Sequence, residues 1–76
     1  MSLSKTVAQN LHAARTSRKL SQAAVASAAG VSVSYISMLE RAQRSPPLAT
    51  LEAVAKALRV SPVDLFQDSR GRPRSR

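Results

Sequence analysis

Residues able to contact a nucleic acid are gathered between Ser32 and Arg44. Ser32 and Ser34 carry hydroxyl groups that both donate and accept hydrogen bonds, and Val33 between them offers an apolar surface. Such groups can contact the edges of bases, including the thymine methyl group, whereas the guanidinium of Arg44 suits a phosphate. The combination indicates a surface that binds nucleic acid rather than one that transforms a substrate.

The chain has few residues with which to catalyse a reaction. It contains no Cys and a single His, His12, so neither a thiolate site nor a His-based metal cluster can form. The sequence contains no recognisable pair of a nucleophile and a general base, and the four acidic residues form no evident carboxylate pair. We therefore expect no enzyme activity, no metal site and no cofactor.

The charge balance favours a polyanionic partner. Twelve Lys and Arg residues stand against four Asp and Glu residues, for a net charge of +8, and no acidic residue precedes Glu40. Four of the arginines lie in the last seven positions. Such a surplus is typical of proteins that bind double-stranded DNA.

Short helices must position these side chains, and no strand is needed. Ser21 and Ser32 are placed to cap two helices, and Gly30 between them suits a turn with positive φ. Ser61 followed by Pro62 is typical of a further helix start. Apolar periodicity predicts five helices, over about 4–19, 22–28, 33–41, 48–58 and 61–66.

These elements predict an all-α, compact five-helix domain over residues 1–68, with the helix-turn-helix proper at 21–41. Residues 69–76 contain no apolar side chain and are expected to form a disordered basic tail. The acid-free start of the chain could also be read as an organellar transit peptide, but its apolar positions favour an ordinary first helix. We expect a cytoplasmic, nucleoid-associated bacterial or phage protein with no membrane segment.

The region around the two capped helices resembles the lambda repressor and Cro family, also called the xenobiotic-response-element type, from about Val7 to Gln67. A narrower resemblance to restriction–modification controller proteins rests on Tyr35-Ile36-Ser37, Glu40-Arg41 and Arg44. The positions that carry the wider one are Arg15, Leu20-Ser21-Gln22, Ala26, Gly30-Val31-Ser32, Ile36, Leu39-Glu40-Arg41, Pro46, Leu48, Thr50-Leu51, Ala55-Lys56-Ala57-Leu58, Val60-Ser61 and Leu65-Phe66.

The resemblance implies a lambda-repressor-like fold whose third helix reads bases in the DNA major groove. Tyr35 could contact DNA or serve as a core side chain with its hydroxyl at the surface. The base-contacting positions would be Ser32, Val33, Ser34, Ser37 and Met38. The positions that contact the DNA backbone would be Gln22, Tyr35, Arg41, Gln43 and Arg44.

The resemblance also implies a partly buried structural ion pair between Arg15 and Glu40. Ala42 and Pro47 depart from the family pattern, in which Gly and a capping Ser are common, so the loop between them is less predictable. The family function would be a transcriptional regulator, a repressor or autoregulator, acting as a homodimer on a near-palindromic operator. From the length of this chain we expect no small-molecule effector domain.

Apolar residues in the fifth helix, Val63, Leu65 and Phe66, are more than so short a helix needs on a monomer, and we expect them at the dimer interface. In the tail, Arg70, Arg72 and Arg74 match the core of an AT-hook, which lies in the minor groove, although a non-specific basic arm would look the same. Two rival functions stay open: an architectural DNA-binding protein with little sequence preference, and an antitoxin-like protein-interaction module.

Overall fold

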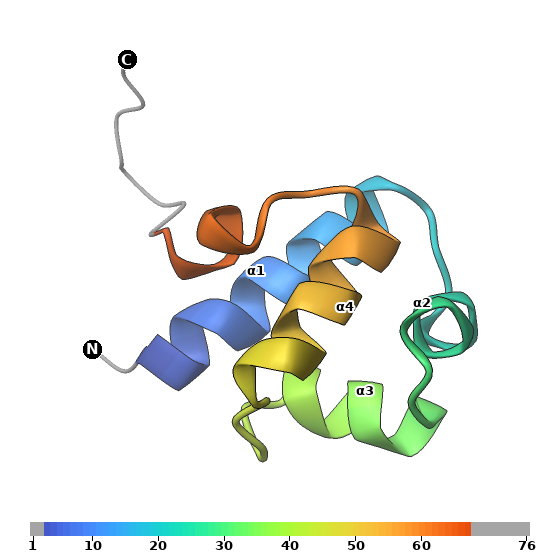
Figure 1. Ribbon diagram of the computed structural model, residues 1–76, viewed down its shortest axis with the longest axis horizontal. Helices are drawn as coiled ribbons and strands as arrows, with labels where there is room; N and C mark the ends of the chain where they lie inside the picture. The colour runs from blue at the N-terminus through green and yellow to red at the C-terminus, as the bar shows by residue number, and fades with distance from the viewer. Residues whose placement is uncertain (1–2, 68–76) are drawn as a thin grey trace.

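The computed structural model describes residues 3–67. They form four α-helices and one short 3₁₀ helix, with no strand in that range. The elements are α1 (Leu3–Ser17), α2 (Gln22–Ala29), α3 (Val33–Glu40), α4 (Leu48–Leu58) and η1 (Pro62–Phe66). In Figure 1 α4 lies in front of α1, with α3 along the bottom and α2 at the right. α2 packs against α3 and α4, whereas α1 packs against α3 and η1.

The prediction of a fifth α-helix was wrong in its type. Ser61 caps η1 as expected, because its hydroxyl accepts from the Val63 N–H and Asp64 completes a capping box. Gln67 then adopts an extended conformation (φ −88°, ψ 140°), so only a five-residue 3₁₀ turn forms. 3₁₀ structure occurs in short pieces because its hydrogen bonds are poorer than those of an α-helix.

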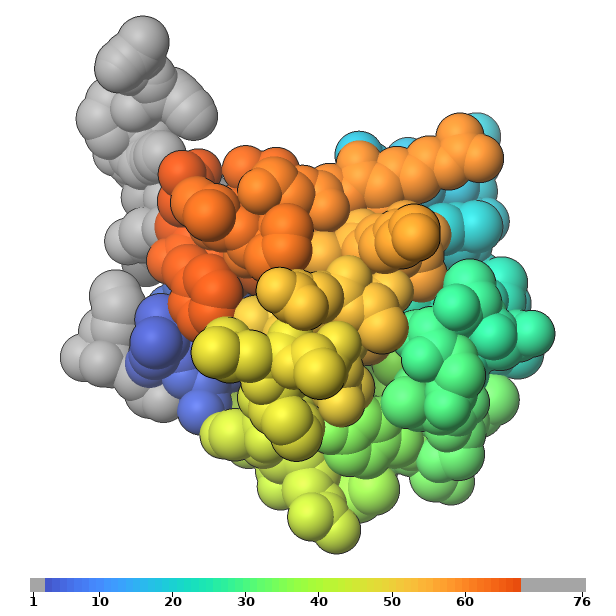
Figure 2. Space-filling view, in the orientation of Figure 1, coloured from blue at the N-terminus to red at the C-terminus, as the bar shows by residue number. Residues whose placement is uncertain are grey.

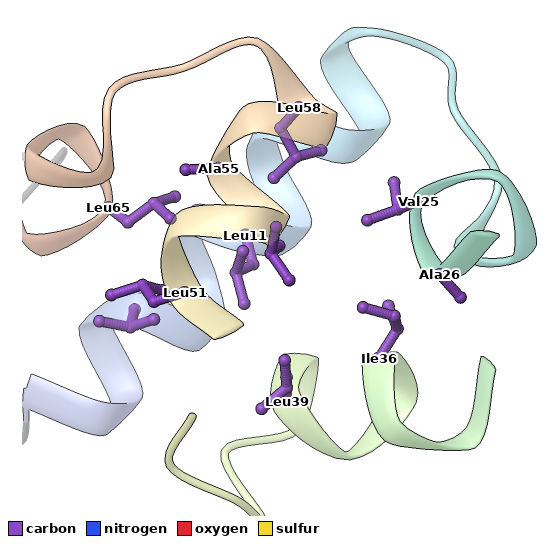
Figure 3. Close-up of a cluster of buried hydrophobic side chains, with 11 residues drawn as sticks. Leu11, Val25, Ala26, Ile36, Leu39, Leu51, Ala55, Leu58 and Leu65 are labelled. Carbon is purple, nitrogen blue, oxygen red and sulfur yellow. The ribbon is translucent and has the colours of Figure 1, made fainter. Parts of the chain in front are cut away.

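The core is one cluster of small and branched aliphatic side chains contributed by every element (Figure 3). The first helix belongs to it, since α1 buries Val7 and Leu11 in the cluster. The cluster comprises Val7, Leu11, Val25, Ala26, Ile36, Leu39, Leu51, Val54, Ala55, Leu58 and Leu65.

All four α-helices end in the same way, with a left-handed residue that lets the chain fold back on the last turn. These residues are Lys19 (φ 58°), Gly30 (φ 75°), Ala42 (φ 59°) and Arg59 (φ 62°). In each case the next amide bonds a carbonyl five residues earlier, the pattern of a Schellman motif. Only one of the four positions uses glycine, the residue for which this conformation carries no steric cost.

A buried amide fastens η1 to the first helix. The Nδ2 atom of Asn10 donates to the carbonyl oxygens of Leu65 (2.8 Å) and Gln67 (2.7 Å). Asn10 is the buried polar residue of the described chain, with 9% of its surface exposed. These bonds hold the end of the described chain against the middle of α1.

Candidate nucleic-acid interface

The turn between α2 and α3 sets the direction of the third helix. Ser21 and Ser32 cap the two helices, each accepting a hydrogen bond from the amide three residues later (2.9 and 3.0 Å). Gly30 supplies the left-handed turn between them. The two helices meet at a bend of 111°, within the range of a helix-turn-helix.

One face of α3 is anchored and the other is open. Ile36 and Leu39 are buried in the core, with 2% and 1% of their surface exposed. On the opposite face Val33 is 46% exposed and Ser34 is exposed. In Figure 2, α3 and the loop that follows it form the lower edge of the molecule. The exposed face at the start of α3 is therefore available to a partner.

The remaining predicted base-contacting residues differ in exposure. Ser37 and Met38 are half-buried. Ser32 is exposed, but its hydroxyl oxygen already accepts the Tyr35 N–H as the helix cap. Tyr35 itself is half-buried and packs against the core cluster. The aromatic ring of Tyr35 thus packs against the core, which is one of the two roles that the sequence left open for it.

Two guanidinium groups flank the C-terminal end of α3. Arg41 and Arg44 are both exposed, as is Gln43 between them. The loop is shaped by Ala42, and the Gln43 N–H bonds the Met38 carbonyl at 2.9 Å. Within residues 3–67 neither guanidinium takes part in an ion pair. Both charges remain available to an anionic partner.

The carboxylate of Glu40, the last residue of α3, gathers side chains from two other helices. Arg15 of α1 donates to both oxygens, with Nε 2.6 Å from Oε2 and Nη2 3.1 Å from Oε1. Gln22 of α2 donates from Nε2 to Oε1 at 3.2 Å, and His12 Nδ1 lies 3.0 Å from the same oxygen. Arg15 also donates from Nη1 to the Leu20 carbonyl at 2.8 Å.

This arrangement changes the ionisation of both members of the pair. Burial raises the pKa of Glu40, but hydrogen bonds from Arg15, His12 and Gln22 outweigh it and hold that pKa below its ordinary value. The hydrogen bond to Glu40 raises the pKa of Arg15. Side-chain exposures of 6% for Glu40 and 14% for Arg15 place the pair largely out of water.

The structure thus brings Arg15 and Glu40 together and adds two residues that the sequence analysis did not connect with them. Gln22 was expected to face the DNA backbone, yet in the structure its amide bonds Glu40. His12 was considered only as a metal ligand. Its spacing of three residues from Arg15 on one helix face was the signal that could have found it.

The residues predicted for a dimer interface separate into two groups. Val63 and Phe66 are 62% and 37% exposed, but Leu65 is 1% exposed and packs in the core of its own chain. The prediction that Leu65 reaches a partner was therefore wrong. Two further large hydrophobic residues are exposed: Leu3 and Leu48, 58% and 73% exposed, line a shallow apolar groove together with Phe66.

The tail residues Arg70, Arg72 and Arg74, and the boundary at 68–69, lie outside the described residues. In residues 3–67 no group of three or more His, Cys, Asp or Glu residues is placed to hold a metal ion. No single helix in that range is long and apolar enough to cross a membrane, and the sharply bent pair of α2 and α3 meets that test by length and composition only.

Comparison with known proteins places this geometry among DNA-binding regulators. A family model described as helix-turn-helix matches residues 11–65. The immunity repressor of Bacillus phage phi105 is 49% identical over 53 residues, 70% of this chain but 37% of that protein. An uncharacterized HTH-type transcriptional regulator of Sinorhizobium fredii is 40% identical over 65 residues, 86% of this chain and 84% of that protein.

Two solved structures show how closely the fold agrees. The restriction–modification controller protein C.AhdI from Aeromonas hydrophila has a TM-score of 0.80 and 35% identity, covering 83% of this chain and 96% of that one. The P22 c2 repressor, solved in complex with a synthetic operator, has a TM-score of 0.77 and 35% identity with the same coverage.

Proposed function

Because this chain belongs to the helix-turn-helix family of DNA-binding transcriptional regulators, which are not enzymes, we propose that it represses transcription as a homodimer on a near-palindromic operator. The observation that carries the proposal is the capped helix α3, whose exposed face is followed by two guanidinium groups, Arg41 and Arg44, that form no ion pair within residues 3–67. A helix of this kind fits the major groove, where bases are distinguishable from one another.

Direct base contacts are proposed for the outer face of α3. Val33 offers an apolar surface to a thymine methyl group, and the Ser34 hydroxyl can donate or accept at a base edge. Ser37 and Met38 are half-buried and would add contacts at the rim of the helix. The Ser32 hydroxyl accepts the cap bond, so its own hydrogen remains available for a base or a phosphate.

Backbone contacts are proposed for the positions around α3. Arg41, Gln43 and Arg44 are exposed on the loop and suit phosphates. Gln22 Nε2 carries two hydrogens, and only one is needed for its bond to Glu40. The second hydrogen can reach a phosphate at the start of α2, so the internal bond orients the Gln22 amide without preventing a DNA contact.

The proposed dimer surface is the apolar patch formed by Val63, Phe66, Leu3 and Leu48. These side chains are the large exposed hydrophobic residues of the described chain apart from Val33 on α3. A shallow groove of about 170 Å³ connects three of them and would receive an apolar side chain from a second copy. An exposed apolar patch is a common mark of such an interface.

Selection of bound duplexes from a random DNA pool tests the function. We expect enrichment of one near-palindromic sequence. Val33→Ala or Ser34→Ala should change which bases are enriched, because those side chains reach base edges. Arg41→Gln or Arg44→Gln should weaken all duplexes alike and lower the slope of log affinity against log salt by about one each.

Two outcomes would contradict the proposal. Equal binding of all duplexes, with a steep salt dependence, would instead indicate an architectural DNA-binding protein. Copurification of a stoichiometric second protein that abolishes DNA binding would indicate an antitoxin-like interaction module. The Glu52→Gln variant, an exposed change on α4, serves as the control that should leave the selected sequence unaltered.

A further inference from the structure

A second basic surface lies on the side of the molecule away from α3. Arg18 and Arg59 line an open recess of about 380 Å³ between the C-terminal ends of α1 and α4. In Figure 1 these two helix ends meet at the top of the molecule, whereas α3 runs along the bottom. The recess is therefore accessible when the exposed face of α3 is covered.

The lining of this recess is amphipathic. Leu20 and Ala57, both half-buried and packed against the core, form its apolar part, and the two arginines lie beside them. Within residues 3–67 neither Arg18 nor Arg59 takes part in an ion pair, and no acidic residue lines the recess. Two unpaired cations beside an apolar surface select a ligand that carries negative charge and apolar groups together.

The backbone at the recess is held in an unusual conformation. Arg59 has φ 62° at the end of α4, where glycine would avoid the steric cost. Lys19, next to Arg18, has φ 58° at the end of α1. A cation near a helix C-terminus is stabilising because it offsets the partial negative charge there, which explains in part why basic residues stand at these positions. This effect of the helix dipole does not explain the apolar surface between the two helix ends.

We propose that this recess docks an acidic protein segment with interspersed apolar side chains, contributed by a partner that engages the regulator while it is on DNA. A second DNA duplex is disfavoured as the occupant, because its phosphate backbone would leave Leu20 and Ala57 without an apolar contact. Acidic side chains of the segment pair with Arg18 and Arg59, and a leucine-sized side chain lies against Leu20. This partner contact goes beyond the proposed DNA binding and does not require a particular operator.

The test is a titration of the full chain with the synthetic peptide Asp-Asp-Leu-Asp-Leu-Asp-Asp, followed by amide chemical shifts at about 150 mM salt. We expect shifts confined to the recess, and about fivefold to tenfold weaker binding of the same peptide with Ser in place of Leu. The titration is repeated with saturating DNA, and the same shifts should occur, because the recess lies away from α3.

Arg59→Gly is the decisive variant, because it removes the charge and relieves the positive φ, so a loss of binding cannot come from misfolding. We expect it to weaken the peptide about threefold to fivefold. Lys19→Gly is the matched control: it also removes one charge at a positive-φ residue, but Lys19 does not line the recess, and its effect should stay below about twofold.

Four results would overturn the proposal. Three are shifts that map to α3, equal affinity of the Ser-substituted peptide, and equal effects of Arg59→Gly and Lys19→Gly. The fourth is competition between DNA and the peptide, which would assign the recess to a phosphate contact. Each of these results is independent of the operator selection, so failure here leaves the proposed repressor function standing.

Discussion

At the scale of single residues, Glu40 decides how α3 is held. Its carboxylate sits at the end of α3 and receives hydrogen bonds from side chains of α1 and α2. The bonds from Arg15 form a two-pronged pair that fixes direction as well as distance. The orientation of α3 thus rests on one buried ionised group as well as on apolar packing.

Removing this carboxylate should destabilise the fold more than it changes any DNA contact. Glu40→Ala leaves the largely buried Arg15 guanidinium without its partner, and we expect a loss of about 3 kcal/mol in the free energy of unfolding. Urea denaturation followed by circular dichroism measures it. Glu52→Ala, an exposed acidic residue on α4, is the control and should change stability by less than about 0.5 kcal/mol. A parental melting curve for Glu40→Ala would contradict a structural role of the pair.

Acid should remove the same contribution. The pKa of Glu40 is lower in the folded chain than in the unfolded one, so the unfolded state binds more protons as the pH falls. The stabilisation is fully present above the unfolded value of about 4.5 and is lost as the pH falls through the folded value. Denaturation of the parent and of Glu40→Gln at several pH values from 6 to 3 should give converging stabilities. A constant difference would refute the assignment.

At the scale of elements, the strained backbone conformations of the described chain lie at the C-terminal ends of the helices. Four Schellman ends give short helices well-defined stops, yet three of them force a side chain into the left-handed region. Such a residue costs roughly 1 kcal/mol relative to glycine in the same place. The N-terminus of α4 also lacks a stabilising cap, because Pro47 is the N-cap residue and supplies no side-chain hydrogen bond.

Exchanging glycine and alanine at two of these ends should have opposite effects. Ala42→Gly should raise the free energy of unfolding by about 1 kcal/mol, and Gly30→Ala should lower it by a similar amount. At Gly30 nothing lies within 4 Å of an added Cβ, so the expected cost comes from the backbone alone. Thermal melting of the two variants measures both shifts, each of roughly 4–8 °C. Shifts of the same sign would show that loop packing, not φ, dominates.

Sequence patterns predicted α4 to its boundaries and the other three α-helices to within two residues, because caps and apolar periodicity are local signals. They placed the fifth helix within one residue of η1 but did not predict its 3₁₀ type or the hydrogen bonds from Asn10 that hold it against α1. The Arg15–Glu40 contact came from the family resemblance. The roles of His12 and Gln22 depend on how three helices converge, which spacing along the chain does not reveal.

At the scale of the whole molecule, the described chain presents three surfaces with different chemistry. The exposed face of α3 and its loop is polar and basic, the patch around Val63 and Phe66 is apolar, and the recess between Arg18 and Arg59 combines both characters. One core of small side chains supports all three surfaces (Figure 3). The effect of a substitution on one surface can therefore be measured without altering the other two.

The apolar patch should control assembly. Val63→Lys places a charge on a residue that is 62% exposed, so the monomer fold should survive while association weakens. Sedimentation should show a shift toward monomer, and operator affinity should fall at least about tenfold because both half-sites no longer bind together. Ala13→Lys, an exposed change on α1, is the matched control and should leave assembly unchanged. A parent chain that is monomeric at high micromolar concentration, with and without DNA, would reject the dimer.

The basic arginines at the end of the chain should act on affinity more than on choice of sequence. Deleting residues 70–76 removes four positive charges, so binding should weaken and its salt dependence should flatten while the selected operator core persists. An AT-hook would make the loss larger on operators flanked by A·T runs than on G·C-flanked ones. Equal losses on the two kinds of flank would assign these residues to general electrostatic attraction.

The hydrogen bonds from Asn10 to the carbonyls of Leu65 and Gln67 affect local unfolding of η1. Terminal turns usually fray alone, with opening free energies near zero. Here the carbonyl groups of Leu65 and Gln67 are bonded to the middle of α1, and Leu65 is part of the core. Local opening of η1 would expose both the Asn10 amide and a leucine side chain. Hydrogen exchange should therefore give the η1 amides the same opening free energy as the amides of α1. In that case η1 opens together with the core rather than before it.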